Sequence, residues 1–338
     1  MPDLFIDHFV SYPGDYRSFK RDLERVVRQG GGVILRVRQT IAKGGNAVNT
    51  ALALSRLGGE AKLILRTDET GLALLRHFSR GENIILDHVK SDGRMAASTL
   101  LEFKIGRKVV NVMLGDQGSV IDFGPEFLTD EDFEAIRDAD YVGVFNWSEN
   151  SRCEELASKV FSYAKEHGRA RTFFDPGDPS TRPRRIKSLF TNLLEKGLID
   201  AIGLNENEFS WLFRYIRSGT RRGLKENLKF YRESIPLLFE KTGSRIDLHA
   251  ASYALSYNGR SISFAPSFIV KPIRSTGAGD TWNAANMFGD SINLPPVQRL
   301  LFANAAAGLY ISSLSPNPPT LKDVIVMMKS AKLKRTLI

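Results

Sequence analysis

The sequence has little cysteine and no long apolar segment. It contains one cysteine, Cys153, among 338 residues, so the chain can form no internal disulfide and offers no thiolate cluster for a metal. No uninterrupted apolar run approaches the roughly 18 residues that a membrane helix needs. The first residues, MPDLFIDHF, include Asp3 and Asp7 and lack a basic region followed by an apolar one, so they are not a signal peptide. These absences exclude a disulfide-stapled domain and a membrane span, and we expect a cytoplasmic protein.

The composition is that of a globular protein with excess positive charge. Hydrophobic residues make up 42% of the chain and charged residues 25%, and the net charge is +9. The basic residues are scattered among acids, in segments such as RSFKRDLERVVRQ and RSGTRRGLK, as on solvated faces. We therefore expect no nucleic-acid partner, and a positive field that gathers small anions such as nucleotides is favoured. No Gly-x-Gly-x-x-Gly follows a first strand, which disfavours a dinucleotide-dependent dehydrogenase.

Strand patterns alternate with helical patterns along most of the chain. This alternation predicts a three-layer α/β/α sandwich with a mostly parallel central sheet. Two hairpins interrupt it, one over 97–114 and one that turns on Asn258-Gly259, and the first would belong to a small β layer beside the main sheet. Helices are expected over 15–28, 44–59, 70–81, 151–167, from about 206, and in the last two long apolar segments. Strands are expected over 33–41, 61–67, 141–146, 171–175, 199–205 and 236–241.

The segment STGAGD, residues 275–280, combines small residues with an acid at the start of a helical pattern. A helix N-terminus presents unpaired N–H groups and partial positive charge, and glycine lets an anion approach the backbone closely. Phosphoryl transfer requires charge stabilisation of the migrating group and a base beside the attacking hydroxyl. Asp280 lies where such a base would be. An ordinary capped turn is the alternative interpretation of this segment taken alone.

Two motifs together make the chain resemble the ribokinase-like sugar kinases of the PfkB family. One is STGAGDTW, residues 275–282, and the other is GGNAVNTALALSRLG, residues 44–58. They occur in the family's order, and the resemblance covers essentially the whole chain. It implies a single ribokinase-like domain over 1–338, with a mostly parallel sheet and a small β-sheet lid formed by segments roughly 9–43 and 95–116.

The resemblance implies roles for residues at both motifs. Asp280 would be the catalytic base, and Gly277, Ala278 and Gly279 would form the anion hole for the transferring phosphate. Thr276, which precedes the hole, would belong to the nucleotide site.

The substrate-binding residues that the resemblance implies come from the first half of the chain. Gly44, Gly45 and Asn49 would contact substrate hydroxyls, since an amide can both donate to and accept from a diol. Asp7 matches the family's acid near its first strand, and Asn146 falls where another substrate-facing polar group is often found. The alternatives are a helix-terminal residue for Asn49 and a surface strand end for Asp7.

Two further segments resemble the family's nucleotide site. Asn205 and Glu208, in LNENEF, match an Asn-x-x-Glu pattern that acts on the phosphates and the magnesium shell, although an acid-rich helix start would look the same. A turn containing Lys241, Thr242 and Gly243 resembles the strand-end turn that receives the nucleotide. Asn304 resembles the residue beside the adenine.

The chain departs from the family pattern at Arg274. The family commonly has an aspartate at this position, six residues before the catalytic acid, where it helps to bind a monovalent cation. A guanidinium cannot ligate potassium and could replace the ion's charge, so we do not expect activation by potassium.

The expected function is an ATP- and Mg²⁺-dependent kinase that phosphorylates a hydroxyl of a sugar or related small polyol. A nucleoside kinase of the same family and a catalytically silent nucleotide- or sugar-binding regulator are the alternatives. The small β layer would expose strands that a second copy could pair with, so a homodimer through the lid is also expected.

Overall fold

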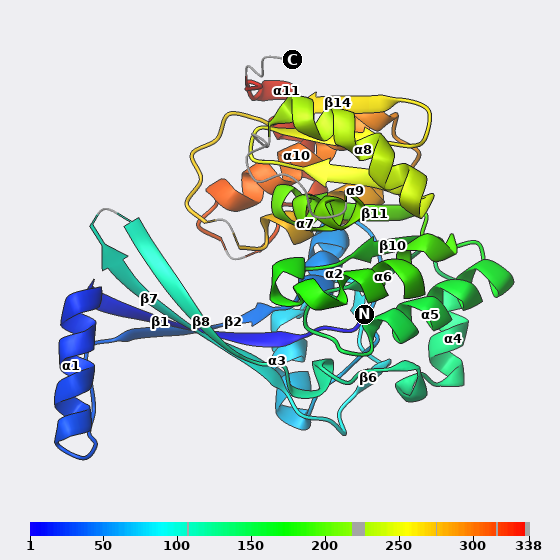
Figure 1. Ribbon diagram of the computed structural model, residues 1–338. Coiled ribbons are helices and arrows are strands. Elements are labelled where there is room, and N and C mark those ends of the chain that lie inside the picture. The colour runs from blue at the N-terminus through cyan, green and yellow to red at the C-terminus, as the bar shows by residue number, and fades with distance from the viewer. Residues whose placement is uncertain (107, 218–226, 275, 316, 335–338) are drawn as a thin grey trace.

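The protein is described by a computed structural model covering residues 1–106, 108–217, 227–274, 276–315 and 317–334 (Figure 1). Its frame consists of two separate sheets, one of six strands within the body and one of four strands that projects from it. Two pairs of very short strands accompany them: β3 (Ala61–Lys62) with β5 (Ile84–Ile85), and β4 (Leu65–Arg66) with β6 (Val89–Lys90).

The six-stranded sheet has the order β14-β13-β12-β11-β10-β9. Its first four strands in sequence run parallel, so their carboxyl ends meet at one edge, whereas the last two form an antiparallel hairpin. The strands are β9 (Tyr141–Phe145), β10 (Arg171–Asp175), β11 (Ala201–Asn205), β12 (Arg245–His249), β13 (Tyr253–Tyr257) and β14 (Ile262–Pro266).

Helices cover both faces of this sheet because its strands are apolar on both sides. Phe174 and its neighbours pack against α5 to α8, whereas the adjacent Phe173 packs with residues of α2 and α9 on the opposite face. The helices α10 and α11 join α9 over the hairpin strands. This confirms the predicted α/β sandwich with a mostly parallel central sheet.

The helices that cover the sheet are short to medium in length. They are α2 (Asn46–Arg56), α3 (Glu69–Phe78), α4 (Asp130–Arg137), α5 (Cys153–His167), α6 (Ile186–Asn192), α7 (Glu206–Ile216), α8 (Leu228–Thr242), α9 (Ala278–Ser291), α10 (Pro296–Ser312) and α11 (Leu321–Ser330). No helix in the described ranges combines the length and apolar character that crossing a bilayer would require.

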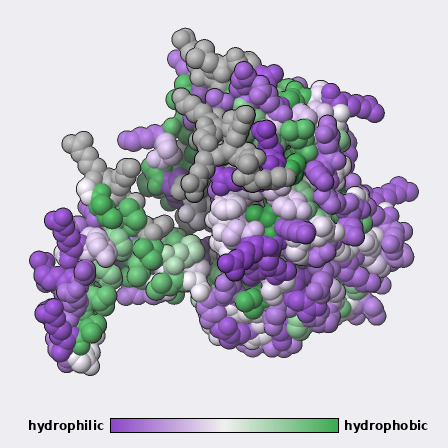
Figure 2. Space-filling view, viewed as in Figure 1, coloured by the Kyte–Doolittle hydropathy of each residue, from purple (hydrophilic) through white to green (hydrophobic). Residues whose placement is uncertain are grey.

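The four-stranded sheet has the order β2-β1-β7-β8 and reaches out from the body, with α1 (Tyr16–Arg28) at its far end (Figure 1). Its strands are β1 (Phe5–Asp15), β2 (Arg38–Gly44), β7 (Ala96–Ile105) and β8 (Lys108–Asp116). Apolar residues gather on this projection (Figure 2), and several are solvent-exposed: Ile41, Ile105, Val112, Met113 and Leu114.

Three of the predicted strands differ from the structure. The strand expected over 236–241 is wrong, because these residues belong to α8. Asn227 caps that helix, and its buried residues Tyr231, Ile235, Leu238 and Thr242 recur at helical spacing. The predicted strand began only at Pro236, so it contained too few of these residues to show the helical period. The strand expected over 33–41 lies instead at Arg38–Gly44, and the one over 61–67 is split into β3 and β4. Helix α11 was not predicted.

Candidate functional site

The N-terminus of α9 forms the centre of the site. Gly277 is the N-cap, with a left-handed φ of 80°, and a Cβ at this position would lie 2.8 Å from the hydroxyl of Tyr310. Glycine is therefore required here. The N–H groups of the first turn, starting at Ala278, have no acceptor within the helix, so they are available to an anion beside Gly279.

Asp280 occupies the third position of α9 and is only 8% exposed. Its Oδ2 accepts a hydrogen bond of 2.9 Å from Nδ2 of Asn49, which is in α2. Burial, reinforced by the negative charge of Asp175, raises the pKa of Asp280 well above that of a free aspartate. The structure thus brings together the two motifs that are about 230 residues apart in the sequence.

Asp3, which was not predicted as a site residue, holds the start of α2, the helix that carries Asn49. Its fully buried carboxylate accepts the backbone N–H groups of Asn46 and Ala47 at 2.7 and 2.9 Å. It thereby caps α2, whose own N-cap, Gly45, has no side chain and a φ of 96°. Because a glycine N-cap has no side chain, the first N–H groups of α2 need an acceptor oxygen from another part of the chain. The glycine at the start of this predicted helix is therefore the signal that could have pointed to an acid such as Asp3.

Asn146 and Asp175 lie where β9 and β10 end. The amide of Asn146 donates to Asp3 (2.9 Å) and accepts from Ser148 (2.8 Å), so its bonds are made within the protein. Asp175, also not predicted, accepts from Asn283 of α9 at 2.7 Å, and burial raises its pKa to about 6. The two side chains tie the carboxyl edge of the sheet to the segments that carry Asp3 and Asp280.

Asp7 and Gly44 face each other at the base of the projecting sheet. Phe5 of β1 pairs with Gly44 of β2, and a Cβ on Gly44 would lie 2.5 Å from the Asp7 carboxylate. Burial raises the pKa of Asp7 to about 6, against the opposing effects of Ser98 and Lys43. The absence of a side chain at Gly44 thus leaves room for the carboxylate of Asp7.

Asn205 and Glu208 form the capping box of α7. Asn205 accepts from the Glu208 N–H at 3.0 Å, and the Glu208 carboxylate accepts from the backbone N–H of Asn205 at 2.8 Å. Burial, together with Asp175, raises the pKa of Glu208 well above its usual range. The pair therefore has a structural task, and it lies at the carboxyl edge of β11 next to the acids around Asp280.

Three of the predicted nucleotide-binding residues lie at the other edge of the sheet, and a fourth is bonded within the protein. Lys241, Thr242 and Gly243 end α8 and precede β12, so they lie at the amino edge of the sheet, opposite to Asp280. Asn304 is buried in α10, where it accepts from Trp282 and donates to the carbonyls of Ala265 and Pro266. The assignment of Lys241, Thr242 and Gly243 as a strand-end turn is therefore corrected, whereas the role of Asn304 stays a prediction.

Strand β12 ends beside the first turn of α9. Its last residue, His249, packs against Trp282 with ring centroids 5.0 Å apart and the ring planes tilted by 34°, and a Cβ on Gly279 would lie 3.3 Å from the imidazole ring. Burial lowers the pKa of His249 to about 4, so the imidazole is neutral near pH 7. The turn after β12, residues 250–252, therefore follows a strand end that lies beside the first turn of α9.

Arg274 lies three residues before Gly277, the N-cap of α9, and is held in place. Its Nη2 donates to the carbonyl of Ser313 at 2.6 Å, and its guanidinium lies 5.3 Å from the centre of the Tyr310 ring. Tyr310 in turn contacts the position of Gly277. A permanent cation thus links the end of α10 to the segment that leads into α9, in which Thr276 is solvent-exposed.

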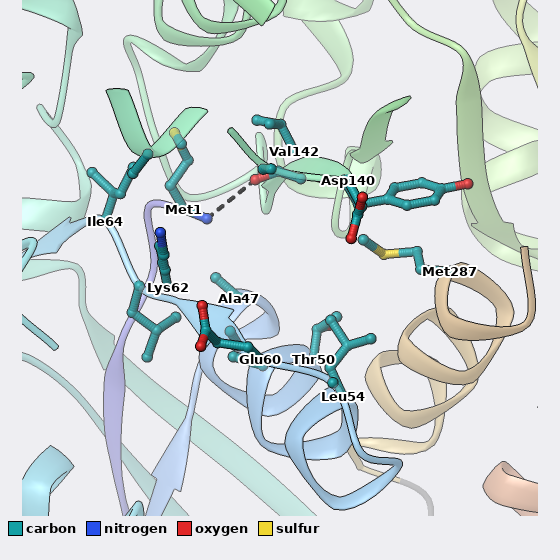
Figure 3. A pocket seen from close by; sticks show the side chains of 18 of the residues that line it. Met1, Ala47, Thr50, Leu54, Glu60, Lys62, Ile64, Asp140, Val142 and Met287 are labelled. Carbon is teal, nitrogen blue, oxygen red and sulfur yellow. Dashed lines mark hydrogen bonds between the residues drawn. The ribbon is translucent and has the colours of Figure 1, made fainter. Parts of the chain in front are cut away.

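A separate cleft of about 500 Å³ lies between β9, α2 and α9 (Figure 3). Thr50, Lys62, Asp140 and Met287 are among the residues around it, and Met1 enters it, donating from its amino group to the carbonyl of Gly143. Ala47, whose backbone N–H donates to Asp3, also lines it, but Asp7, Asn49, Glu208 and Asp280 do not, so this cleft is not the site described above.

These features define an α/β phosphotransferase of the ribokinase type. A model of the pfkB family of carbohydrate kinases matches residues 17–323. A 5-dehydro-2-deoxygluconokinase of Geobacillus kaustophilus (strain HTA426) is 24% identical over 291 residues, which cover 83% of each chain.

Two solved structures show the same fold at low identity. The ribokinase of Arabidopsis thaliana, complexed with ribose and ATP, superposes with a TM-score of 0.77 at 19% identity, and an adenosine kinase of Sinorhizobium meliloti with 0.73 at 17% identity. Each comparison covers 97% of both chains. The chain belongs to the pfkB family of carbohydrate kinases, and it is an enzyme that transfers a phosphoryl group to an alcohol acceptor.

Proposed function

We propose that the chain transfers the γ-phosphoryl group of ATP to a hydroxyl of a sugar or small polyol, with Asp280 as the base. The observation that carries this proposal is the position of Asp280: a buried carboxylate in the first turn of α9, next to free backbone N–H groups. One helix terminus then supplies both the base and the anion site that in-line transfer needs.

The roles of the other residues follow from where they lie. The N–H groups around Gly277, Ala278 and Gly279 would stabilise the charge on the migrating phosphoryl group. Asp7 and Gly44 lie on the projecting sheet, where they would bind hydroxyls of the acceptor. The exposed Thr276 and the turn after His249 would face the nucleotide.

The acids around Asp280 suit a hard divalent cation that arrives with its nucleotide. Glu208 lies with Asp175 and Asp280 in a group in which burial, followed by the repulsion between the acids, raises the pKa values of Glu208 and Asp280. Within the described ranges no three His, Cys, Asp or Glu side chains are grouped as a metal cage. Mg²⁺ needs no such cage, because it is commonly held by one or two carboxylates with water and phosphate oxygens. Glu208 and Asp175 would hold the ion, and the ion would neutralise phosphate charge.

The proposal is tested by measuring ADP release across a panel of sugars, polyols and nucleosides, with and without Mg²⁺. We expect release that requires one class of acceptor and Mg²⁺. ATP hydrolysis that is independent of every acceptor would instead favour a nucleotide- or sugar-binding regulator. The nucleoside alternative is favoured by one observation, the similarity to an adenosine kinase fold, and the nucleosides of the panel decide it.

Potassium is expected to leave the rate unchanged. The guanidinium of Arg274 already donates to the Ser313 carbonyl beside the anion-binding turn, so this position carries a cation that cannot exchange. The measurement is the initial rate in matched potassium, sodium and Tris chloride buffers of equal ionic strength. Stimulation by potassium alone would contradict the role that we assign to Arg274.

We also propose that a second copy of the chain covers the projecting sheet. Exposed apolar side chains on its outer strands, including Ile41, Met113 and Leu114, would be buried in a homodimer. Sedimentation equilibrium is expected to give twice the mass of the chain, and Met113→Asp is expected to lower it towards the monomer. A monomer at all concentrations would contradict this proposal.

A further inference from the structure

Three side chains from three elements form a continuous hydrogen-bonded series that ends at Asp280. Nζ of Lys43, near the end of β2, donates to Oδ1 of Asn49 in α2 at 3.0 Å. Nδ2 of the same amide donates to Oδ2 of Asp280 in α9 at 2.9 Å. Lys43 is not part of either sequence motif, and Asn49 had been assigned to the substrate.

The chemistry of the three groups fixes the direction of this series. A lysine ammonium can only donate and an ionised carboxylate can only accept, whereas an amide has one accepting end and one donating end. With Lys43 and an ionised Asp280 on its two sides, the amide of Asn49 therefore has a single favourable orientation. If it turned over, its oxygen would face the carboxylate oxygen and its NH₂ would face the ammonium, and both contacts would be repulsive.

We propose that Lys43 is a positioning residue for Asp280: it holds the Asn49 amide so that its N–H groups face the carboxylate. This inference rests on the proposed function, because it assigns a task to Asp280 as a base. It also changes the role of Asn49, since both ends of its amide are engaged within the protein and its task is to orient the base rather than to bind the acceptor.

The charges around the series decide what Lys43 contributes. Burial opposes the charge on Lys43 and lowers its pKa, whereas Asp280 and Asp7 favour that charge. Among the groups that act on Asp280, Asn49 and Lys43 favour its ionised form and the neighbouring acids oppose it. The charged and titratable groups facing Lys43 or Asp280 are Asp3 from the N-terminal segment, Asp7 from β1, Glu82 from the loop after α3, Asp175 from β10, Glu208 from α7, Arg274 from the segment before α9, and Tyr310 from α10.

Removing the ammonium should therefore make Asp280 harder to ionise. In Lys43→Met the side chain keeps most of its volume but loses its charge and its donor, so the amide is no longer held from that side. Lys43→Arg keeps the charge and the donors. We expect the pKa of Asp280 to rise by about one unit or more in the methionine variant, a tenfold or larger change in its ionisation equilibrium, and to rise less in the arginine variant.

The experiment reads the ionisation of Asp280 directly. The protein is labelled with ¹³C at aspartate Cγ, the Asp280 signal is identified by its loss in Asp280→Asn, and its titration is followed by NMR. In parallel, the acid limb of kcat against pH is expected to move to higher pH by the same amount. Lys62→Met, a substitution of an exposed lysine outside the site, is the matched control and should move neither.

A second substitution keeps the test informative if Lys43→Met loses stability. Asn49→Leu removes the amide through which Lys43 acts, so it should raise the pKa of Asp280 by itself. If Lys43 acts only through the amide, the double variant Lys43→Met/Asn49→Leu should give Asp280 the same pKa as Asn49→Leu alone. Any further rise in the pKa of Asp280 in the double variant measures the direct effect of the Lys43 charge.

The outcomes separate this inference from the proposed function. An unchanged Asp280 titration in Lys43→Met overturns the inference whether or not the chain is active. A higher KM for the acceptor with an unmoved acid limb also overturns it, because Lys43 would then be a substrate contact. If the unmodified chain releases no ADP with any acceptor, the proposed function fails, and the NMR titration still decides the role of Lys43.

Discussion

Asp280→Asn is expected to lower kcat by about 10²- to 10⁴-fold, the range that a general base typically contributes. Asparagine keeps the size of the side chain, and its oxygen can still accept the bond from Asn49, so the N-terminus of α9 should be preserved. What is lost is the group that receives the proton of the attacking hydroxyl. Because the N–H groups of Gly277 to Gly279 remain in place, binding of ATP should survive.

The measurement combines single-turnover ADP release with calorimetric titration of ATP. Asp122→Asn, an exposed aspartate outside the site, is the control and should retain normal rates. Asp280→Asn with nearly normal kcat would show that another group takes the proton. Loss of ATP binding together with kcat would indicate instead that the helix terminus had been disturbed, which the melting temperature would reveal.

The centre of this site could be predicted from the sequence because its information is local. STGAGD places a glycine at a left-handed N-cap and an acid in the first turn of the same helix, so five or six consecutive residues specify the arrangement. The parallel sheet was predictable for a similar reason, since each strand and helix has its own period. The contact between Asn49 and Asp280 was not predicted, because nothing local in the sequence joins α2 to α9.

The residues that were missed act over long distances in the sequence. Asp3, Asp175 and Lys43 follow no motif, and each gains its role from partners that folding brings close, such as Asn46, Asn283 and Asn49. Residues 241–243 were wrongly predicted to follow a strand because the end of α8 was interpreted as a strand. The failure to recognise one helical period thus affected the assignment of three residues, Lys241, Thr242 and Gly243.

Asp247→Ala is expected to cost about 3–5 kcal/mol of unfolding free energy, the usual range for breaking a buried ion pair on one side. Asp247 is fully buried in β12, and its two oxygens accept from Arg245 (2.9 Å), Asn286 (2.8 Å), Ser256 (2.5 Å) and Arg299 (3.3 Å). Arg299 is itself only 2% exposed. Without the carboxylate, two guanidinium groups stay between the sheet and α9 and α10 with less compensation. Urea unfolding at pH 7 measures the loss, and a change no larger than that of Asp122→Ala would contradict it.

The pH dependence of stability provides an independent test of the same ion pair. Burial opposes the charge on Asp247, but Arg245 and Arg299 outweigh this effect and lower its pKa to about 2, compared with an ordinary value of 3.8. A depressed pKa in the folded state stabilises the protein above the unfolded value, and this stabilisation is lost as pH falls from about 4 through 2. The difference of roughly two units corresponds to about 2–3 kcal/mol. Asp247→Asn should therefore be less stable than the parent at pH 7, and the gap between them should narrow between pH 4 and pH 2. A gap that stays constant over this range would mean that Asp247 is not held ionised by the two arginines, and that the shape of its side chain rather than its charge accounts for its place in β12.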